Sequence, residues 1–160
     1  MHGYRTRLHI LLEAAAWLLL LASFLIAVYG IKTLPETIAT HYNMAGEADG
    51  YGSPATLLIL PISMTIPLGI VSLVAHFVRP EYWNTPFQVT ERNAAAVYRN
   101  LATMMFLIEL ELSVFTLYMQ VKSFLQDGTG MLAASGLLML AMFVTIIVLS
   151  VRAWKHNKRV

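Results

Sequence analysis

The sequence predicts an all-α integral membrane protein, a four-helix bundle in a single polytopic domain over residues 1–160. Two observations predict this class. The composition is 58% hydrophobic and only 12% charged, with a mean hydropathy of +0.64, and the apolar residues fall into four long stretches. A water-soluble fold of 160 residues has too little interior to bury so much apolar surface. A lipid solvent removes this difficulty, so we expect the bilayer to surround the bundle.

Each apolar stretch is close to the roughly 20 residues that a helix needs to cross about 30 Å of hydrocarbon. Within such a helix every backbone polar group finds its partner inside the segment. The predicted helices cover residues 8–31, 55–78, 91–121 and 131–152, and a structured external loop covers 32–54. The third helix is expected to begin after Thr90, a good N-cap residue, with Glu91 at the positive end of the helix dipole. The first stretch exceeds the roughly 7–15 residues typical of a signal peptide core, so we interpret it as an uncleaved span.

The basic residues predict the orientation of the helices. Nine of the eleven Lys and Arg residues fall on one side of the predicted spans and two on the other. The nine are Arg5, Arg7, Arg79, Arg92, Arg99, Arg152, Lys155, Lys158 and Arg159, and the two are Lys32 and Lys122. Because basic loops stay in the cytoplasm, this asymmetry predicts cytoplasmic N- and C-termini and an external loop outside.

The remaining composition excludes several classes of protein. The isoelectric point is near 9.0, but the basic residues are sorted between loops and do not form one face with interleaved aromatics, so no nucleic-acid partner is expected. The chain has no cysteine, which excludes disulfides, thiol nucleophiles and cysteine-based metal sites. The sequence has no cofactor fingerprint, no HExxH motif and no phosphate-binding glycine loop, and it therefore does not predict an enzyme or a cofactor.

The external loop holds the most informative polar residues. Its candidate ligand-binding or loop-structuring residues are His41, Asn43, Gly46, Glu47, Asp49, Gly50 and Tyr51. In an extended strand His41 and Asn43 would point to one side, as would Glu47 and Asp49, so a fold-back could gather an imidazole, an amide and two carboxylates. Two interpretations stay open. His41, Glu47 and Asp49 could bind a divalent metal, or the same residues could only stabilise turns at the membrane surface.

Two blocks of the sequence resemble a known family. They are LPETIATHYNMAGEADGYGS at residues 34–53 and WNTPFQVTERNAAAVYRNLATMMFL at residues 83–107. They resemble the characteristic loop and second block of an uncharacterised bacterial membrane family, the domain that also forms the N-terminal part of SdpI-type immunity proteins. The resemblance implies a bacterial inner (plasma) membrane protein and, by analogy, protection against a membrane-active peptide toxin or sensing of one. It brings no catalytic residue, and the sequence leaves no room for the further C-terminal domain of the immunity proteins.

A second feature lies inside the third predicted helix. Glu109 and Glu111 fall about ten residues into its apolar stretch, which begins at Leu101, near the bilayer midplane at roughly 1.5 Å per residue, where a carboxylate costs about 2.5–3.5 kcal/mol. Two positions apart on a helix, they differ by about 200° and cannot share one face. They are expected either to make neutral hydrogen bonds to Ser63, Thr65 or Ser113, or to form a proton- or cation-linked site.

Glu13 lies about one turn inside the first helix. It is within reach of His9 on the same helix, and its depth is similar to that of His76 on the second helix. We expect a local pair at the cytoplasmic boundary.

These observations lead to three functional hypotheses. The first is a non-enzymatic recognition, immunity-like or sensing module whose external loop binds a peptide or a partner membrane protein. The second is a small ion- or proton-coupled transporter that uses Glu109 or Glu111, and the third is a metal-dependent membrane hydrolase built on His41, Glu47 and Asp49. A homo-oligomer is also expected, because one of the two helix acids faces away from the bundle interior.

Overall fold

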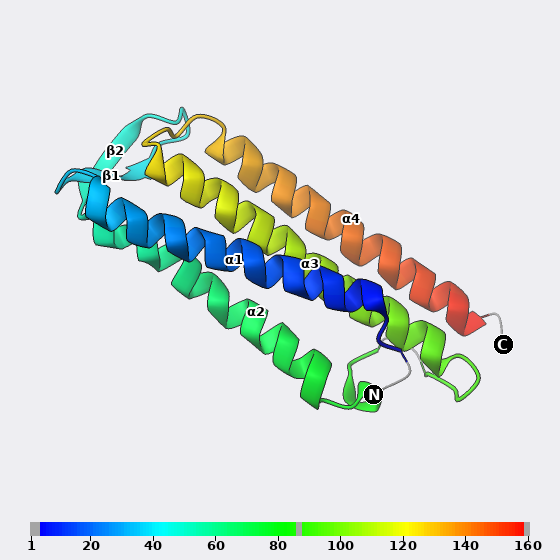
Figure 1. Ribbon diagram of the computed structural model, residues 1–160. Coiled ribbons are helices and arrows are strands. Elements are labelled where there is room, and N and C mark those ends of the chain that lie inside the picture. Colours follow the sequence, from blue (N-terminus) through cyan, green and yellow to red (C-terminus); the bar gives the residue numbers. More distant parts are fainter. Residues whose placement is uncertain (1–3, 86–87, 159–160) are drawn as a thin grey trace.

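The computed structural model describes residues 4–85 and 88–158 and is a bundle of four long helices with a β-hairpin at one end (Figure 1). The elements are, in chain order, α1 (Arg7–Thr33), β1 (Ile38–Tyr42), β2 (Ala48–Gly52), the 3-10 helix η1 (Pro54–Leu58), α2 (Ile59–Phe77), the 3-10 helix η2 (Pro80–Tyr82), α3 (Ala94–Phe124) and α4 (Met131–Lys158). In the described part of the chain four helical segments are long and apolar enough to cross a membrane. The predicted fold class is confirmed.

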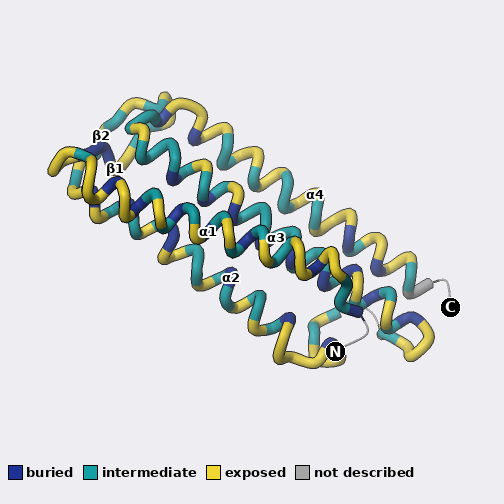
Figure 2. The backbone as a smooth tube through the Cα atoms, in the orientation of Figure 1, coloured by how far each residue is buried: buried dark blue, intermediate teal, exposed yellow. Residues whose placement is uncertain are grey.

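The helix α3 is the centre of the bundle. It packs against α1, α2 and α4, while α4 packs mainly on α3 (Figure 1). Figure 2 shows that buried residues follow α1 and α3, whereas α4 is largely exposed. The hairpin and the α3–α4 loop lie together at one end of the bundle, here called the hairpin end, and both chain termini lie at the other, here called the terminal end.

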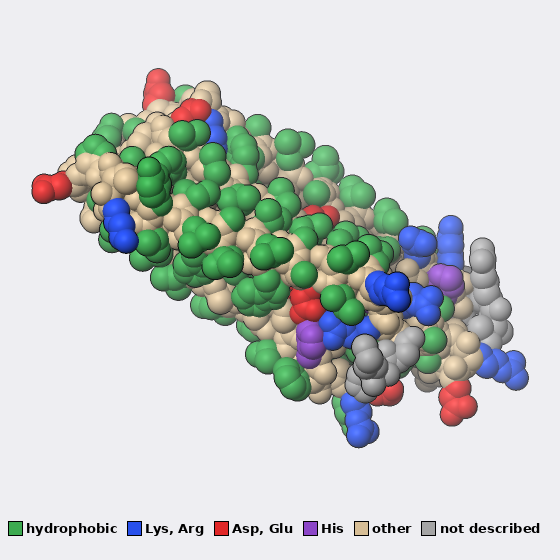
Figure 3. All heavy atoms as spheres, in the orientation of Figure 1, with side chains coloured by type: hydrophobic (Ala, Val, Ile, Leu, Met, Phe, Trp, Pro, Cys, Tyr) green, Lys and Arg blue, Asp and Glu red, His purple; other side chains and the backbone are tan. Residues whose placement is uncertain are grey.

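The bundle interior is narrow, and the outer surface is apolar. Phe106, Leu20 and Leu68 are among the largest fully buried side chains. Many other large apolar side chains point outward at helical spacing, such as Leu11, Leu18 and Leu25 on α1. Figure 3 shows this apolar belt between two charged ends. A surface of this kind suits lipid and not water.

Several helix boundaries differ from the sequence prediction. α1 ends at Thr33 and not at 31, α3 at Phe124 and not at 121, and α4 at Lys158 and not at 152. Two helix starts differ as well. Residues 91–93 form a turn, and α3 begins at Ala94 with Asn93 as its N-cap. Oδ1 of Asn93 accepts a hydrogen bond from Thr90 N at 3.0 Å, so the residues that were expected to begin the helix form the turn before it. The second predicted span begins as the 3-10 helix η1, which Ser53 caps by accepting from Ala55 N. Among the basic residues counted for orientation, the Lys158 side chain and Arg159 lie outside the described residues.

The segment between α1 and α2 folds as an antiparallel hairpin. The strands pair Ala39 with Tyr51 and His41 with Gly50, and a bulge between these pairs shifts the register. Asn43 closes the turn, because its Oδ1 accepts hydrogen bonds from Ala45 N at 2.9 Å and Glu47 N at 3.0 Å. Such side-chain bonds to the following backbone are typical of Asx turns.

Candidate functional site

The hairpin is docked on the loop between α3 and α4. The α-carbon of Gly128 lies directly against Gly46 and the ring of Tyr42, leaving no space for a side chain at position 128. Gly46 has a φ of 83°, a conformation that favours glycine. Oε1 of Gln126 accepts a hydrogen bond from Ala39 N at 2.6 Å. The hairpin is therefore fixed by close backbone packing and by a side-chain hydrogen bond to β1.

A groove of about 550 Å³ lies between the hairpin and the start of α4. One wall is β1 and the hairpin turn, and the other is the first two turns of α4 with neighbouring residues of α3 and the α3–α4 loop. The lining residues are Thr40, His41, Tyr42, Asn43, Met44, Ala45, Gly46, Met119, Ser123, Gly128, Gly130, Met131, Leu132, Ala133 and Ser135. The groove therefore combines a strand edge, hydroxyl and imidazole groups, and three methionine side chains.

The predicted polar residues of the hairpin form two separate pairs. Nδ1 of His41 lies 2.5 Å from Oδ1 of Asp49, and Nδ2 of Asn43 donates to Oε2 of Glu47 at 3.1 Å. In residues 4–85 and 88–158 no group of three or more His, Asp or Glu side chains could hold a metal ion. A divalent metal that uses His41, Glu47 and Asp49 together would require a rearrangement of the hairpin.

The two other predicted residues, Gly50 and Tyr51, make contacts within the hairpin. Gly50 lies opposite His41, where a Cβ would come within 2.9 Å of the His41 Cβ. The Tyr51 side chain is exposed, and its hydroxyl donates to Ala48 O at 3.5 Å. Of the seven predicted residues, His41, Asn43 and Gly46 line the groove.

The hairpin end also holds a charged pair on the α3–α4 loop. Asp127 accepts hydrogen bonds from Nζ of Lys122 and from Oγ1 and N of Thr129. These bonds, the one from Lys122 first, lower the pKa of Asp127 to about 2. Burial and the neighbouring Asp127 charge raise the pKa of Tyr42. Asp127 therefore stays ionised next to the groove.

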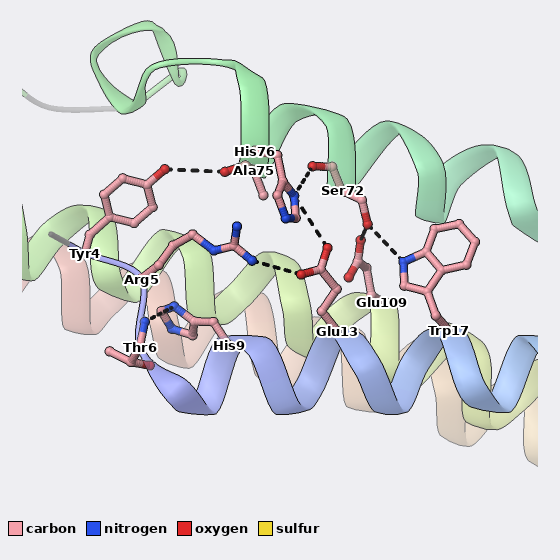
Figure 4. A network of polar contacts seen from close by, with 10 residues as sticks. All are labelled: Tyr4, Arg5, Thr6, His9, Glu13, Trp17, Ser72, Ala75, His76 and Glu109. Carbon is pink, nitrogen blue, oxygen red and sulfur yellow. Dashed lines mark hydrogen bonds and ion pairs between the residues drawn. The ribbon is translucent and has the colours of Figure 1, made fainter. Parts of the chain in front are cut away.

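A second polar region lies between α1, α2 and α3 near the terminal end (Figure 4). Nη2 of Arg5 donates to Oε2 of Glu13 at 2.9 Å, and Nδ1 of His76 lies 3.5 Å from Oε1 of Glu13. The Arg5 guanidinium also lies over the Phe106 ring, 5.5 Å from its centroid. The predicted pairing of Glu13 with His76 is present, and Arg5 adds a partner that sequence reasoning missed.

His9 takes a different position from the one predicted. Its Nδ1 accepts from Thr6 N at 3.3 Å, and its Nε2 lies 2.9 Å from Oγ1 of Thr103. Because the Thr103 hydroxyl donates to Arg99 O, it accepts from Nε2 of His9, which fixes the neutral tautomer. His9 thus caps α1 and joins it to α3, and it does not pair with Glu13.

Glu109 is fully buried within this second region. Its Oε1 accepts from the Ser72 hydroxyl at 3.0 Å, and Ser72 Oγ accepts in turn from Nε1 of Trp17 at 3.1 Å (Figure 4). Oε2 of Glu109 makes no hydrogen bond with the described residues. One side-chain hydrogen bond offsets only a small part of the free energy needed to bury a carboxylate in an apolar interior.

Glu111 points to a different interface, as the helical geometry predicted. Its Oε1 accepts from Oγ1 of Thr145 on α4 at 2.5 Å. The predicted partners of the two acids were wrong: Ser63 and Thr65 donate to carbonyls of their own helix, and Ser113 makes no hydrogen bond with the described residues. Glu109 instead contacts Ser72, about two turns beyond Thr65 on α2, and Glu111 contacts Thr145 on α4, where no partner was predicted.

A line of buried polar residues on α3 was also missed. Glu109, Ser113, Thr116 and Gln120 are all buried and follow each other at intervals of three or four residues, which places them on one face. The spacing is visible in the sequence, and it could have shown that Glu109, and not Glu111, faces the bundle interior.

Together the four spans and the two polar regions define a multi-pass membrane protein. Residues 18–65 match the family described as Domain of unknown function (DUF1648). This match covers most of α1, the whole hairpin and the beginning of α2, and so confirms that this part of the chain is similar to an uncharacterised domain family.

The chain is also similar to an uncharacterized protein of Archaeoglobus fulgidus, with 35% identity over 68 residues. The similar segment is 42% of this chain and 33% of the archaeal protein, so the chain spans about one third of that relative. No solved structure matches the chain. Neither match names an activity.

Proposed function

We propose that the chain is a membrane recognition module that binds a cationic, partly apolar peptide segment in the groove at its hairpin end. The observation that carries the proposal is the groove of about 550 Å³ between β1 and the start of α4. Its size is in the range of ligand-binding pockets. We also propose that the protein lies in the plasma membrane of a bacterium, with both termini in the cytoplasm and the hairpin outside.

The shape of the groove suits an extended peptide. In the described residues β1 pairs with β2 in a two-stranded sheet, and β1 itself forms one wall of the groove. Ala39 N at the start of β1 is bonded to Gln126. The rest of β1, from Thr40 to Tyr42, lines the groove, and a strand that pairs with one neighbour can accept a peptide as an additional strand. The methionines Met44, Met119 and Met131 line the same space, and their unbranched, polarisable side chains adapt to varied apolar partners.

The charge of the hairpin end favours a cationic partner. Glu36, Glu47 and Asp49 lie on or beside the hairpin and Asp127 lies on the facing loop, against the two lysines Lys32 and Lys122. Lys122 is already paired with Asp127. An acidic rim attracts cationic peptides and increases their rate of association. Membrane-active peptides combine positive charge with apolar residues, which suits the apolar and acidic parts of this surface.

The charge of the terminal end supports the proposed orientation. Figure 3 shows Lys and Arg side chains gathered there, and they include Arg5, Arg79, Arg152 and Lys155. Basic residues next to membrane spans favour the cytoplasmic side. The hairpin end then faces outward, where a peptide reaches it without crossing the membrane.

Peptide binding is tested with the full chain in lipid nanodiscs and a synthetic Lys/Leu amphipathic peptide. We expect saturable binding beyond that of empty nanodiscs. Ala133→Trp, which fills the groove, should abolish it, and Glu47→Gln with Asp49→Asn should weaken it. Leu140→Trp is the matched control, because Leu140 is on the same helix, exposed and outside the groove. Binding that Ala133→Trp leaves unchanged would contradict the proposal.

A further inference from the structure

We propose that Glu109 is a proton-binding residue inside the membrane span, and that its proton exchanges with the terminal end of the bundle through Ser72 and the Glu13–His76 pair. The proposed site is separate from the groove at the hairpin end. Its ligand is a proton, and the residues that receive it lie on α1, α2 and α3.

The Glu109 carboxyl group lies in an environment that disfavours a charge. The side chain is fully buried, its Oε1 contacts a single hydroxyl, and its Oε2 makes no hydrogen bond with the described residues. Arg5, the cation of this polar region, is already paired with Glu13 at 2.9 Å. No adjacent cation is therefore left to hold Glu109 as a carboxylate, and in an apolar interior the carboxylic acid is favoured.

Ser72 lies beside both Glu109 and His76. Its hydroxyl contacts Oε1 of Glu109, while its backbone carbonyl lies 2.7 Å from Nδ1 of His76. The same His76 nitrogen lies 3.5 Å from Oε1 of Glu13. Figure 4 shows these groups in sequence from the buried acid to the end of α2. Ser72 thus lies between the buried acid and two groups that exchange protons with solvent.

The two residues of the Glu13–His76 pair differ in exposure. The His76 side chain is 36% exposed and that of Glu13 is 14% exposed, so His76, one residue before the end of α2, is the more accessible of the two. The other titratable groups facing this region are Arg5, already paired with Glu13, Tyr4, whose hydroxyl donates to Ala75 O at 3.4 Å, and His9, whose two ring nitrogens are both occupied by Thr6 and Thr103. His9 is therefore not available as a relay.

The transfer involves one proton and no other reactant. The proton leaves the Glu109 carboxylic acid for the Ser72 hydroxyl, which gives up its own proton as it rotates toward the Glu13–His76 pair. Glu109 becomes a carboxylate, and the proton goes to the Glu13 carboxylate or to Nε2 of His76, because Nδ1 of His76 already donates to Ser72 O. The reverse sequence reloads Glu109.

A polar line in the opposite direction offers the competing route. Ser113, Thr116 and Gln120 continue from Glu109 along α3, and Gln120 lines a second cavity of about 440 Å³ with Ser63 and Ser123 at the hairpin end. From Glu109 to Gln120 the rise is roughly 16 Å, at about 1.5 Å per residue. No ionisable side chain lies among these lining residues, so the terminal route is the one with proton acceptors.

Infrared spectroscopy of the full chain in nanodiscs tests the site. A protonated carboxylic acid gives a carbonyl stretching band separate from that of a carboxylate, and the band shifts when its proton is replaced by deuterium. We expect a band that disappears as the pH rises and is absent in Glu109→Gln but retained in Glu111→Gln. If wild type and Glu109→Gln have identical spectra throughout the pH range, Glu109 does not bind a titrating proton.

The rate of deuterium exchange tests the route. Ser72→Ala and His76→Phe retain the Glu109 carboxyl group, and we expect the shift of its band in D₂O to be several-fold slower in both. Gln120→Leu should leave the rate unchanged. Slow exchange in Gln120→Leu with normal exchange in Ser72→Ala and His76→Phe would overturn the terminal route and assign access to the hairpin end.

Discussion

Gly128 of the α3–α4 loop lies against the backbone of Gly46 at the hairpin turn, and a Cβ at position 128 would come too close to both Gly46 O and the Tyr42 ring. This contact joins a segment between α1 and α2 to a loop that follows it by some 80 residues in the chain. It fixes one wall of the groove relative to the other. The width of the proposed binding site therefore depends on a position where only glycine fits.

Gly128→Ala is expected to separate the hairpin from the loop. A Cβ at this position would overlap the Tyr42 ring and the Gly46 carbonyl, and overpacking of this kind costs about 1–3 kcal/mol. We expect faster proteolysis of residues 40–50 and a lower free energy of unfolding in detergent.

Gly69→Ala is the matched control for this prediction. Gly69 lies inside α2, and a Cβ there meets nothing within 4 Å. Replacement of glycine by alanine inside a helix stabilises by about 1 kcal/mol. If Gly128→Ala and Gly69→Ala have the same rate of proteolysis and the same free energy of unfolding, Gly128 does not make the close contact at the hairpin end.

Asp127 gives the loop a pH dependence. Its hydrogen bonds with Lys122 and Thr129 hold its pKa at about 2, below the ordinary value of 3.8. A lowered pKa in the folded state means that the contribution to stability is fully present above about pH 4 and is lost as the pH falls toward 2. An acid-stable protease should cleave the loop of the wild type faster as the pH falls from 4 to 2. In Asp127→Asn the rate of loop cleavage should not show this increase. If the cleavage rates of wild type and Asp127→Asn change equally with pH, the Lys122–Asp127 pair does not stabilise the loop.

Ser72→Ala tests the hydrogen-bonded contact between the helices. The substitution leaves Nε1 of Trp17 and Oε1 of Glu109 without their shared partner, and a buried polar group left unsatisfied costs about 1–3 kcal/mol. Thermal unfolding in detergent should show this loss. Ser63→Ala serves as comparison, because Ser63 is exposed and bonds only to Leu60 O of its own helix turn. A loss of equal size in both variants would argue against the interhelical role of Ser72.

The orientation in the membrane is tested by single cysteines, since the chain has none of its own. Ala45→Cys lies at the hairpin turn and Arg92→Cys before α3, both at exposed positions. A membrane-impermeant maleimide should label intact cells at position 45 and should label position 92 only after lysis. Labelling of position 92 in intact cells would reverse the proposed topology.

The four spans could be predicted from the sequence because apolar length alone selects helices in lipid. The sequence also predicted that Glu109 and Glu111 lie on different faces of their helix, and in the structure they contact different helices. Their partners did not follow, because Ser72 and Thr145 are brought to these depths by the crossing of α2 and α4 with α3, and the sequence of one helix does not encode that crossing.

The hairpin shows the same limit. Its glycines and Asn43 predicted turns, but the separation of His41–Asp49 from Asn43–Glu47 depends on the strand register and its bulge. The docking of Gly46 on Gly128 joins distant segments, and no local pattern indicates it. Local chemistry was therefore easier to predict than the pairing of elements that builds the groove.

The most direct test of the account places a photoreactive benzoylphenylalanine at single positions of the full chain in nanodiscs, with the Lys/Leu peptide added. Met44 lines the groove and is 83% exposed, Met139 is exposed on α4 outside it, and Tyr82 is exposed at the terminal end. We predict cross-links to the peptide from position 44 and none above background from positions 139 and 82. Equal cross-linking from all three positions would mean that the peptide binds lipid or surface non-specifically, and would contradict a recognition site at the hairpin end.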